Sequence, residues 1–363
     1  MTMADNPLYA LMRRPQDATR LDMAQWDTVI RLARRSDVLA RLCALLETAG
    51  VLDQVPERPR RHLVNDTVMA EKQGRDVLFE VRKILEALQI DQIPPILLKG
   101  AAYVAAGLPA AKGRKFTDID FMVRKELLLN TEAALFKAGW VPGKVHPYDD
   151  KYYRTWMHQI PPVTHMRRKS MLDVHHTILP QTTRVDIEAR KLRDAARPVD
   201  GWPGLWVLSP QDMVLHSMVH LFSEGDFEHA VRDLSDMDML LRHFSSEEGF
   251  WEGLVPRAED LDILRFLYYA LTHLTRLLGT PVPPDVMKQV QKGRPGGLAR
   301  PVMGFCWDHA LRPRHGFCHT RGTDLALMIL YIRSHHQRMP LTLLIPHLVR
   351  KSLRWMTEKN DEA

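Results

Sequence analysis

Apolar side chains recur at helical spacing over most of the first ninety residues. They do so over residues 27–50, where Gly50 is a suitable C-cap, and again from about residue 61 to residue 88. A basic, proline-bearing turn separates the two stretches. The pattern predicts that the N-terminal region, residues 1–90, is entirely helical.

The period changes after Pro94-Pro95, where a short apolar run is typical of a buried strand. A small-residue helix ending at Gly107 follows, and then an alternating strand at Thr117–Val123. Residues 126–139 predict a helix, and residues 140–178 predict further strands, most clearly at Ser170–His176. Strands mixed with helices in this order indicate an α+β core over residues 91–205.

The chain becomes helical again from residue 206 to residue 363. Ser209-Pro210 is a strong helix start, with serine as N-cap and proline in the first helical position. Helices are predicted at 210–222, 228–244, 260–278, 322–338 and 341–357. The predicted fold is therefore α+β, with a small mixed-sheet core flanked by helical N- and C-terminal regions.

Composition narrows the class of protein. The 363 residues are 45% hydrophobic and 26% charged, which is typical of a globular protein, and three cysteines are too few for a disulfide framework. The net charge of 50 − 44 = +6 favours an anionic partner such as a nucleotide or RNA. No secretory signal is visible, and no apolar run approaches the ~18 residues of a membrane span. We expect a cytoplasmic protein with no membrane partner.

Three carboxylates on predicted strands carry the candidate chemistry. Asp118 and Asp120 flank one apolar residue, so both should project from the same strand face, and Asp173 lies on a later strand. Neighbouring carboxylates repel one another unless a cation neutralises them, and Mg²⁺ prefers such oxygen ligands. Lys99 and Gly100 open a helix directly after a strand, where backbone amides can meet a phosphate.

These segments together resemble a known superfamily. LLKGAAYVAAG, GRKFTDIDFMV and MLDVHHTIL are similar to the motifs of the DNA-polymerase-β-like nucleotidyltransferases, and within them to the bacterial family of uncharacterised nucleotidyltransferases. The resemblance covers roughly residues 85–245. It implies that Asp118, Asp120 and Asp173 are catalytic residues that bind Mg²⁺ or Mn²⁺. It also implies that Lys99, Gly100 and Arg114 bind a nucleoside triphosphate, which we expect to be ATP.

Two C-terminal segments of the resemblance carry further candidates. SPQDMVLHSMVHLF and VRDLSDMDMLL resemble the family's histidine-bearing helix and its partner helix. The residues that we expect to line the site are His175, His216, His220, Arg232 and Asp236. His175 could instead be structural. His216 and His220 could bind a metal through their i,i+4 spacing, and Arg232 and Asp236 could simply pair with each other.

Two remaining motifs allow other readings. Cys306, His309, His315 and Cys318 are residue types that suit tetrahedral Zn²⁺, with buried structural cysteines as the alternative. Residues 346–359 predict a basic amphipathic helix that could contact RNA or a membrane surface, or simply present a solvated face.

The predicted activity is transfer of a nucleotidyl group from a nucleoside triphosphate to a hydroxyl. The acceptor could be a small molecule, a tRNA or RNA end, or a protein or peptide side chain. Lys99-Gly100-Ala101 stands where the superfamily usually has Gly-Gly or Gly-Ser, so a serine hydroxyl is missing from the turn. Two alternatives therefore stay open: a non-catalytic nucleotide- or RNA-binding module, and a phosphotransferase that uses the same metal site.

Overall fold

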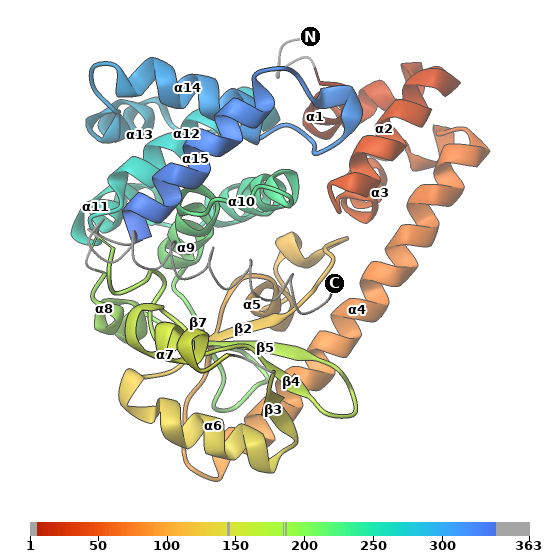
Figure 1. The fold of residues 1–363 in the computed structure, drawn as a ribbon. Helices are drawn as coiled ribbons and strands as arrows, with labels where there is room; N and C mark the ends of the chain where they lie inside the picture. Colours follow the sequence, from red (N-terminus) through yellow and green to blue (C-terminus); the bar gives the residue numbers. More distant parts are fainter. Residues whose placement is uncertain (1–5, 144–145, 184, 186, 339–363) are drawn as a thin grey trace, which may run out of the picture.

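A seven-stranded mixed sheet forms the centre of the α+β fold, as predicted (Figure 1). The computed structural model describes residues 6–143, 146–183, 185 and 187–338. The sheet lies at one end of the molecule in Figure 1, and the C-terminal helices lie at the other. The helix predicted at 341–357 and the amphipathic segment 346–359 fall outside the described residues.

The N-terminal region is helical, as predicted. It contains α1 (Pro7–Arg13), α2 (Met23–Arg35), α3 (Leu39–Thr48) and α4 (Glu57–Gln89). The single helix expected over residues 27–50 is in fact two helices. Asp37 adopts the left-handed backbone conformation (φ 55°), which no α-helix can continue through, and the chain turns there between α2 and α3. The 33-residue α4 runs along one flank of the molecule (Figure 1).

The sheet has the strand order β3-β4-β5-β2-β1-β7-β6. Its strands are β1 (Ile96–Leu97), β2 (Ile119–Met122), β3 (Trp140–Pro142), β4 (Val163–His165), β5 (Met171–His175), β6 (Arg197–Pro198) and β7 (Trp206–Val207). β2 pairs in parallel with β5 and antiparallel with β1. All four residues of β2 are buried, so this central strand is covered on both faces.

Between residues 91 and 205, the described part of the chain also forms four α-helices. They are α5 (Lys99–Ala105), α6 (Leu128–Lys137), α7 (Pro147–Trp156) and α8 (Ala189–Asp194). α7 corrects the prediction for residues 140–178, which gave further strands and no helix. Arg154 near its end pairs with Asp150 one turn earlier (3.0 Å) and with Glu132 of α6 (2.7 Å), contacts that favour a helix over an aromatic-rich strand.

Seven helices follow the sheet within the described residues. They are α9 (Pro210–Ser223), α10 (Ala230–Phe244), α11 (Phe250–Asp260), α12 (Leu264–Leu278), α13 (Pro284–Gln289), α14 (Ala299–Ala310) and α15 (Thr323–Arg338). The predicted cap is present, since the Ser209 hydroxyl accepts from the backbone amide of Asp212. α11, α13 and α14 were not predicted. Among the described helices, none combines the length and the apolar character needed to cross a bilayer.

The N- and C-terminal helices pack against each other as well as against the sheet. The Tyr9 hydroxyl of α1 donates to the carbonyl oxygen of Leu311 (2.5 Å), and Arg41 of α3 reaches Asp236 of α10 (2.6 Å). Both arginine and aspartate are almost fully buried. The three-region division at residues 90 and 205 stays a prediction. Arg114 of the central region also pairs with Asp236 (2.7 Å), so side chains from all three regions meet there.

Candidate active site

The turn between β1 and α5 is unusually tight. Lys99 begins the helix with a left-handed backbone (φ 46°), a strained conformation for a lysine that is common at functional sites. Gly100 follows, and a Cβ atom built there would lie 2.1 Å from a terminal nitrogen of Arg114. Only glycine lets the Arg114 guanidinium lie this close to the backbone. Lys99, Gly100 and Arg114 all line one cavity, and their binding of a triphosphate stays a prediction.

Asp120 and Asp173 lie side by side on adjacent parallel strands. The β2–β5 register pairs Asp120 with Asp173 directly, and it pairs Met122 with His175. Ligand atoms of Asp120, Asp173 and His175 all lie within 4.8 Å of one another. Among the described residues this is the only such cluster of three or more potential metal-ligating side chains.

Asp118 departs from the predicted geometry. It precedes β2 instead of lying on it, so strand alternation does not place its carboxylate beside that of Asp120. Its carboxylate accepts a hydrogen bond from the Thr117 hydroxyl (3.0 Å) and is not part of the metal-ligand cluster. His175 occupies the third position of that cluster in its place.

Asp120 is the most strongly held carboxylate of the cluster. Its Oδ1 lies 3.3 Å from Nζ of Lys99 and 3.0 Å from Nε2 of His175. Burial opposes ionisation of Asp120, but the positive charge of Lys99 and the hydrogen bond with His175 outweigh it and hold its pKa well below the usual range. Burial also disfavours charge on Lys99, yet Asp120 and Glu224 raise its pKa. Both groups are therefore ionised at neutral pH.

Asp173 is in the opposite situation. Its Oδ1 is buried without a hydrogen-bond partner, and burial together with the negative charge of Asp120 raises the pKa of Asp173 to about 6. A buried carboxylate oxygen without a donor, beside a second carboxylate, fits a divalent cation. Oxygen ligands suit Mg²⁺ and Mn²⁺, and the imidazole of His175 is more compatible with Mn²⁺ or a softer metal.

Asp236 of α10 is the centre of a buried ionic network. It accepts from Nε of Arg114 (2.7 Å) and from the guanidinium of Arg41 (2.6 Å). Arg114 also lies over the rings of Phe116 and Tyr103. The alternative, a pair between Arg232 and Asp236, is not observed, because Asp236 bonds to these two arginines and Arg232 pairs instead with Asp233 (3.1 Å).

His216 and His220 of α9 lie beside the site without joining the metal-ligand cluster. His216 is buried, and burial together with the nearby charge of Lys99 holds its pKa well below the usual range. His220 lines the cavity and lies 3.7 Å from Glu224. A shared metal on these two histidines is therefore not supported, whereas a site-lining position is observed for His220.

A cavity of about 250 Å³ gathers most of the predicted residues. It is lined by Lys99, Gly100, Tyr103, Arg114, Thr117, Asp118, Asp120, Ser217, His220, His229, Arg232, Asp233 and Asp236. Apart from the histidines, this lining contains three cationic side chains and four carboxylates. A triphosphate would meet net repulsion there unless a divalent cation accompanied it.

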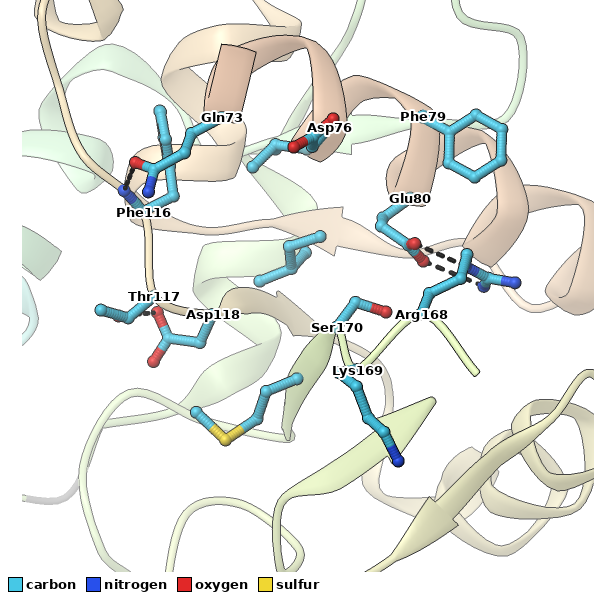
Figure 2. A pocket seen from close by; sticks show the side chains of 13 residues that line it. Gln73, Asp76, Phe79, Glu80, Phe116, Thr117, Asp118, Arg168, Lys169 and Ser170 are labelled. Atoms are coloured by element: carbon cyan, nitrogen blue, oxygen red, sulfur yellow. Dashed lines mark hydrogen bonds and ion pairs between the residues drawn. The ribbon is translucent and has the colours of Figure 1, made fainter. Parts of the chain in front are cut away.

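A second hollow, of about 510 Å³, adjoins this cavity and shares Thr117 and Asp118 with it. We call it the α4 groove, because Gln73, Asp76 and Glu80 of α4 form one wall (Figure 2). Figure 2 shows Glu80 held by Arg168 across the groove, through two bonds of 2.5 and 3.0 Å. Asp118 therefore lines both the cavity, whose wall holds cationic and acidic side chains, and the α4 groove, whose wall is partly apolar.

Comparison with known protein families shows to which family the chain is related. A family described as uncharacterised nucleotidyltransferase matches residues 22–279, well over half of the chain. The chain belongs to this nucleotidyltransferase family. No curated protein and no solved structure matches it. The matched residues include α3, the turn at Lys99, both carboxylate strands and α10, so the whole site described above lies within the family region.

The proposed zinc ligands lie beyond the nucleotidyltransferase match, and they do not converge. Cys306, His309, His315 and Cys318 are all described, yet no three of them come within metal-binding distance of one another. Both cysteines are buried, and the Cys318 sulfur accepts from the side-chain amide of Asn6 (3.3 Å). The structural alternative for these cysteines is the one observed.

Two residues of the candidate site, Arg41 and His158, have no signal in the sequence. Arg41 lies 73 positions before Arg114 in a segment that reads only as an amphipathic helix, and long-range packing alone brings it to Asp236. His158, whose ring is 5.1 Å from that of His175, lies in a segment read as strand. Asp233 could have been found, since it neighbours Arg232 on the helix already singled out.

Proposed function

We propose that this protein is a metal-dependent nucleotidyltransferase that moves a nucleoside monophosphate from a nucleoside triphosphate to an acceptor hydroxyl. The observation that carries the proposal is the Asp120–Asp173–His175 cluster next to a cavity with both cations and carboxylates. The family assignment supports the same kind of reaction. Asp120 and Asp173 would hold Mg²⁺ or Mn²⁺, which would screen the triphosphate charge and polarise the α-phosphate.

The cationic side chains have distinct roles in this proposal. Lys99, with the backbone at Gly100, would contact the phosphates at the start of α5. Arg114 and Arg232 both line the cavity. Arg114 would contact the phosphates through the guanidinium nitrogens that are not bonded to Asp236. The lysine at the turn supplies charge where the superfamily commonly supplies a serine hydroxyl. Asp118 faces both spaces and would contact the metal-bound nucleotide or the acceptor.

The reaction is an in-line displacement at the α-phosphorus. The acceptor oxygen forms a bond to phosphorus, the bond from the α-phosphorus to the bridging oxygen breaks, and pyrophosphate leaves with the electron pair. Asp173 would receive the hydroxyl proton, a role that an ionised carboxylate can fill. We propose that the acceptor group occupies the α4 groove, which opens beside Asp118.

Two finer assignments also belong to the proposal. We propose ATP as the donor to test first. We propose a cytoplasmic location because all three cysteines, Cys43, Cys306 and Cys318, are free and buried, as expected in a reducing compartment.

Labelled nucleotides test the proposal. The purified protein is incubated with Mg²⁺ or Mn²⁺, with α-³²P- or γ-³²P-labelled nucleoside triphosphates in parallel, and with fractionated RNA, protein and metabolites. We expect the α-label to enter one fraction. We expect Asp120→Asn to abolish transfer and Asp285→Asn, an exposed carboxylate on α13, to leave it unchanged.

Other results separate the alternatives. Transfer of the γ-label alone would identify a phosphotransferase and overturn the proposed reaction. If neither label moves while the nucleotide still binds, the non-catalytic binding module is correct instead.

A further inference from the structure

Two hollows outside the active site are each lined by three arginines and at least one histidine. The first, of about 480 Å³, lies between α2 and the start of α4, and the second, of about 250 Å³, lies at the connection between α14 and α15. Their arginines are Arg31, Arg34 and Arg58 in the first and Arg35, Arg312 and Arg314 in the second. We call these six residues the arginine band.

The band is continuous across α2. Arg31 and Arg35 are four residues apart and so are neighbours on the helix surface, and one lines each hollow. In Figure 1 the connection from α14 to α15 runs close to the N-terminal helices, in agreement with Arg35 and Arg312 lining one hollow.

Most of this charge is not neutralised by carboxylates. Asp27 is the one acidic residue that lines either hollow, and it is bonded to Arg31 (2.8 Å). Arg35 pairs with Glu228 (2.6 Å), an exposed contact that contributes little stability and exchanges readily. Among the described residues, Arg34, Arg58, Arg312 and Arg314 have no carboxylate partner.

The choice of side chain indicates the ligand. No lysine lines either hollow, although lysine would serve equally well for solubility. The guanidinium group offers a planar fork of donors that matches the two free oxygens of a phosphate, whereas lysine acts as a point charge. Six arginines in two hollows that are both partly lined by α2 therefore favour a ligand with several phosphates.

The band is connected to the α4 groove by one face of α4. Arg58 and Asp76 are 76 − 58 = 18 residues apart, five complete turns at 3.6 residues per turn, so they share a helix face. Arg58 lines the first hollow of the band, and Asp76 lines the α4 groove. The separation along the helix is about 27 Å, from the 1.5 Å rise per residue. An extended chain lying on this face reaches from the band to the acceptor space.

We propose that the arginine band binds the phosphodiester backbone of a single nucleic acid strand. Binding depends only on the band, while the further statement that the strand's end enters the α4 groove as acceptor rests on the proposed function. A lipid surface is a poorer fit, because the arginines line concave hollows and a bilayer presents a flat array of headgroups.

Fluorescence anisotropy tests the binding with no nucleotide or metal present. The probes are labelled oligouridylate and oligodeoxythymidylate of about 20 nucleotides, long enough for an extended site. The four arginines without a carboxylate partner predict a slope of about −3 for log affinity against log salt, at roughly 0.7 per phosphate on single strands. Arg58→Glu/Arg314→Glu should weaken binding by about 10-fold or more and reduce the slope by about 1.4.

The matched control reverses two exposed cations on the sheet side, Arg124→Glu/Lys137→Glu, which changes the net charge equally. If both double variants weaken binding alike, net charge alone attracts the strand and the band is not a site. If wild-type protein binds phosphatidylserine vesicles but neither oligonucleotide, the ligand class is wrong. Stronger binding of one oligonucleotide identifies RNA or DNA as the source.

The experiment distinguishes a failure of the proposed function from a failure of the arginine band. Asp120→Asn should bind the oligonucleotide like wild type, because Asp120 lies outside the band. Oligonucleotide binding without any nucleotidyl transfer would leave the band assigned and refute only the acceptor role.

Discussion

Gly100→Ala is expected to disrupt the active site despite being a minimal change. The added Cβ would lie 2.1 Å from a terminal nitrogen of Arg114 and 2.6 Å from its Cζ, with a ring carbon of Phe116 at 2.9 Å. Ordinary contact begins at 3.4 Å, so the guanidinium must shift by at least 3.4 − 2.1 = 1.3 Å. Arg114 cannot yield freely, because its Nε donates to buried Asp236 at 2.7 Å.

The size of the effect follows from two opposing contributions. Alanine is favoured over glycine inside a helix by about 1 kcal/mol. Breaking one side of a buried ion pair costs about 3–5 kcal/mol. Gly100→Ala should therefore lower the free energy of unfolding by about 2–4 kcal/mol. It should also raise the dissociation constant for metal-bound nucleotide, since Arg114 lines the cavity.

Gly74→Ala is the matched control. Gly74 also lies inside a helix, α4, and a Cβ there meets no atom within 4 Å. This variant should be as stable as wild type or more stable by about 0.5–1 kcal/mol. Urea unfolding and calorimetric titration of nucleotide measure both variants. If Gly100→Ala unfolds and binds nucleotide like Gly74→Ala, Arg114 is not held against the backbone as described.

Three further predictions concern the surrounding network. Arg41→Met should lower the free energy of unfolding by about 3–5 kcal/mol, since Asp236 loses one buried partner, and equilibrium unfolding measures the loss; an unchanged midpoint would refute the network. Asp173 has a folded pKa raised from 3.8 to about 6, so the folded state holds its proton longer and stability falls as pH rises through that window. Asp173→Asn should therefore be more stable than wild type above pH of about 6 and similar to it below pH of about 4 in unfolding measured across pH, and identical pH profiles would contradict this. Mn²⁺ should raise the melting temperature of wild type but not of Asp173→Asn, and equal shifts would place the metal elsewhere.

Local signals in the sequence were sufficient for most of the site's parts. Lys99 and Gly100 follow a strand and open a helix, and Asp120 and Asp173 stand on strands, as period and turn residues indicated. The family motifs placed these residues together, and the match to the same family confirms that resemblance. His175 was predicted to line the site because it follows Asp173 by two residues on the same strand and so shares its face.

What the sequence did not reveal depends on contacts between distant segments. Asp118 lies outside the metal-ligand cluster because β2 begins only at Ile119, and no local pattern marks that boundary. Arg41 reaches Asp236 only because α3 packs near α10. α7 was read as strand because its aromatic residues favour strands, while its stabilising pairs, Arg154 with Asp150 and Glu132, are partly tertiary.

The most direct test of the account is the stoichiometry of the reaction at the Asp120–Asp173 site. Pyrophosphate release and incorporation of the α-labelled monophosphate are measured together, for wild type, Asp173→Asn and Asp285→Asn. The account predicts equal amounts of both products for wild type and Asp285→Asn, and neither product for Asp173→Asn. Incorporation by Asp173→Asn at the wild-type rate, or release of orthophosphate in place of pyrophosphate, would contradict it.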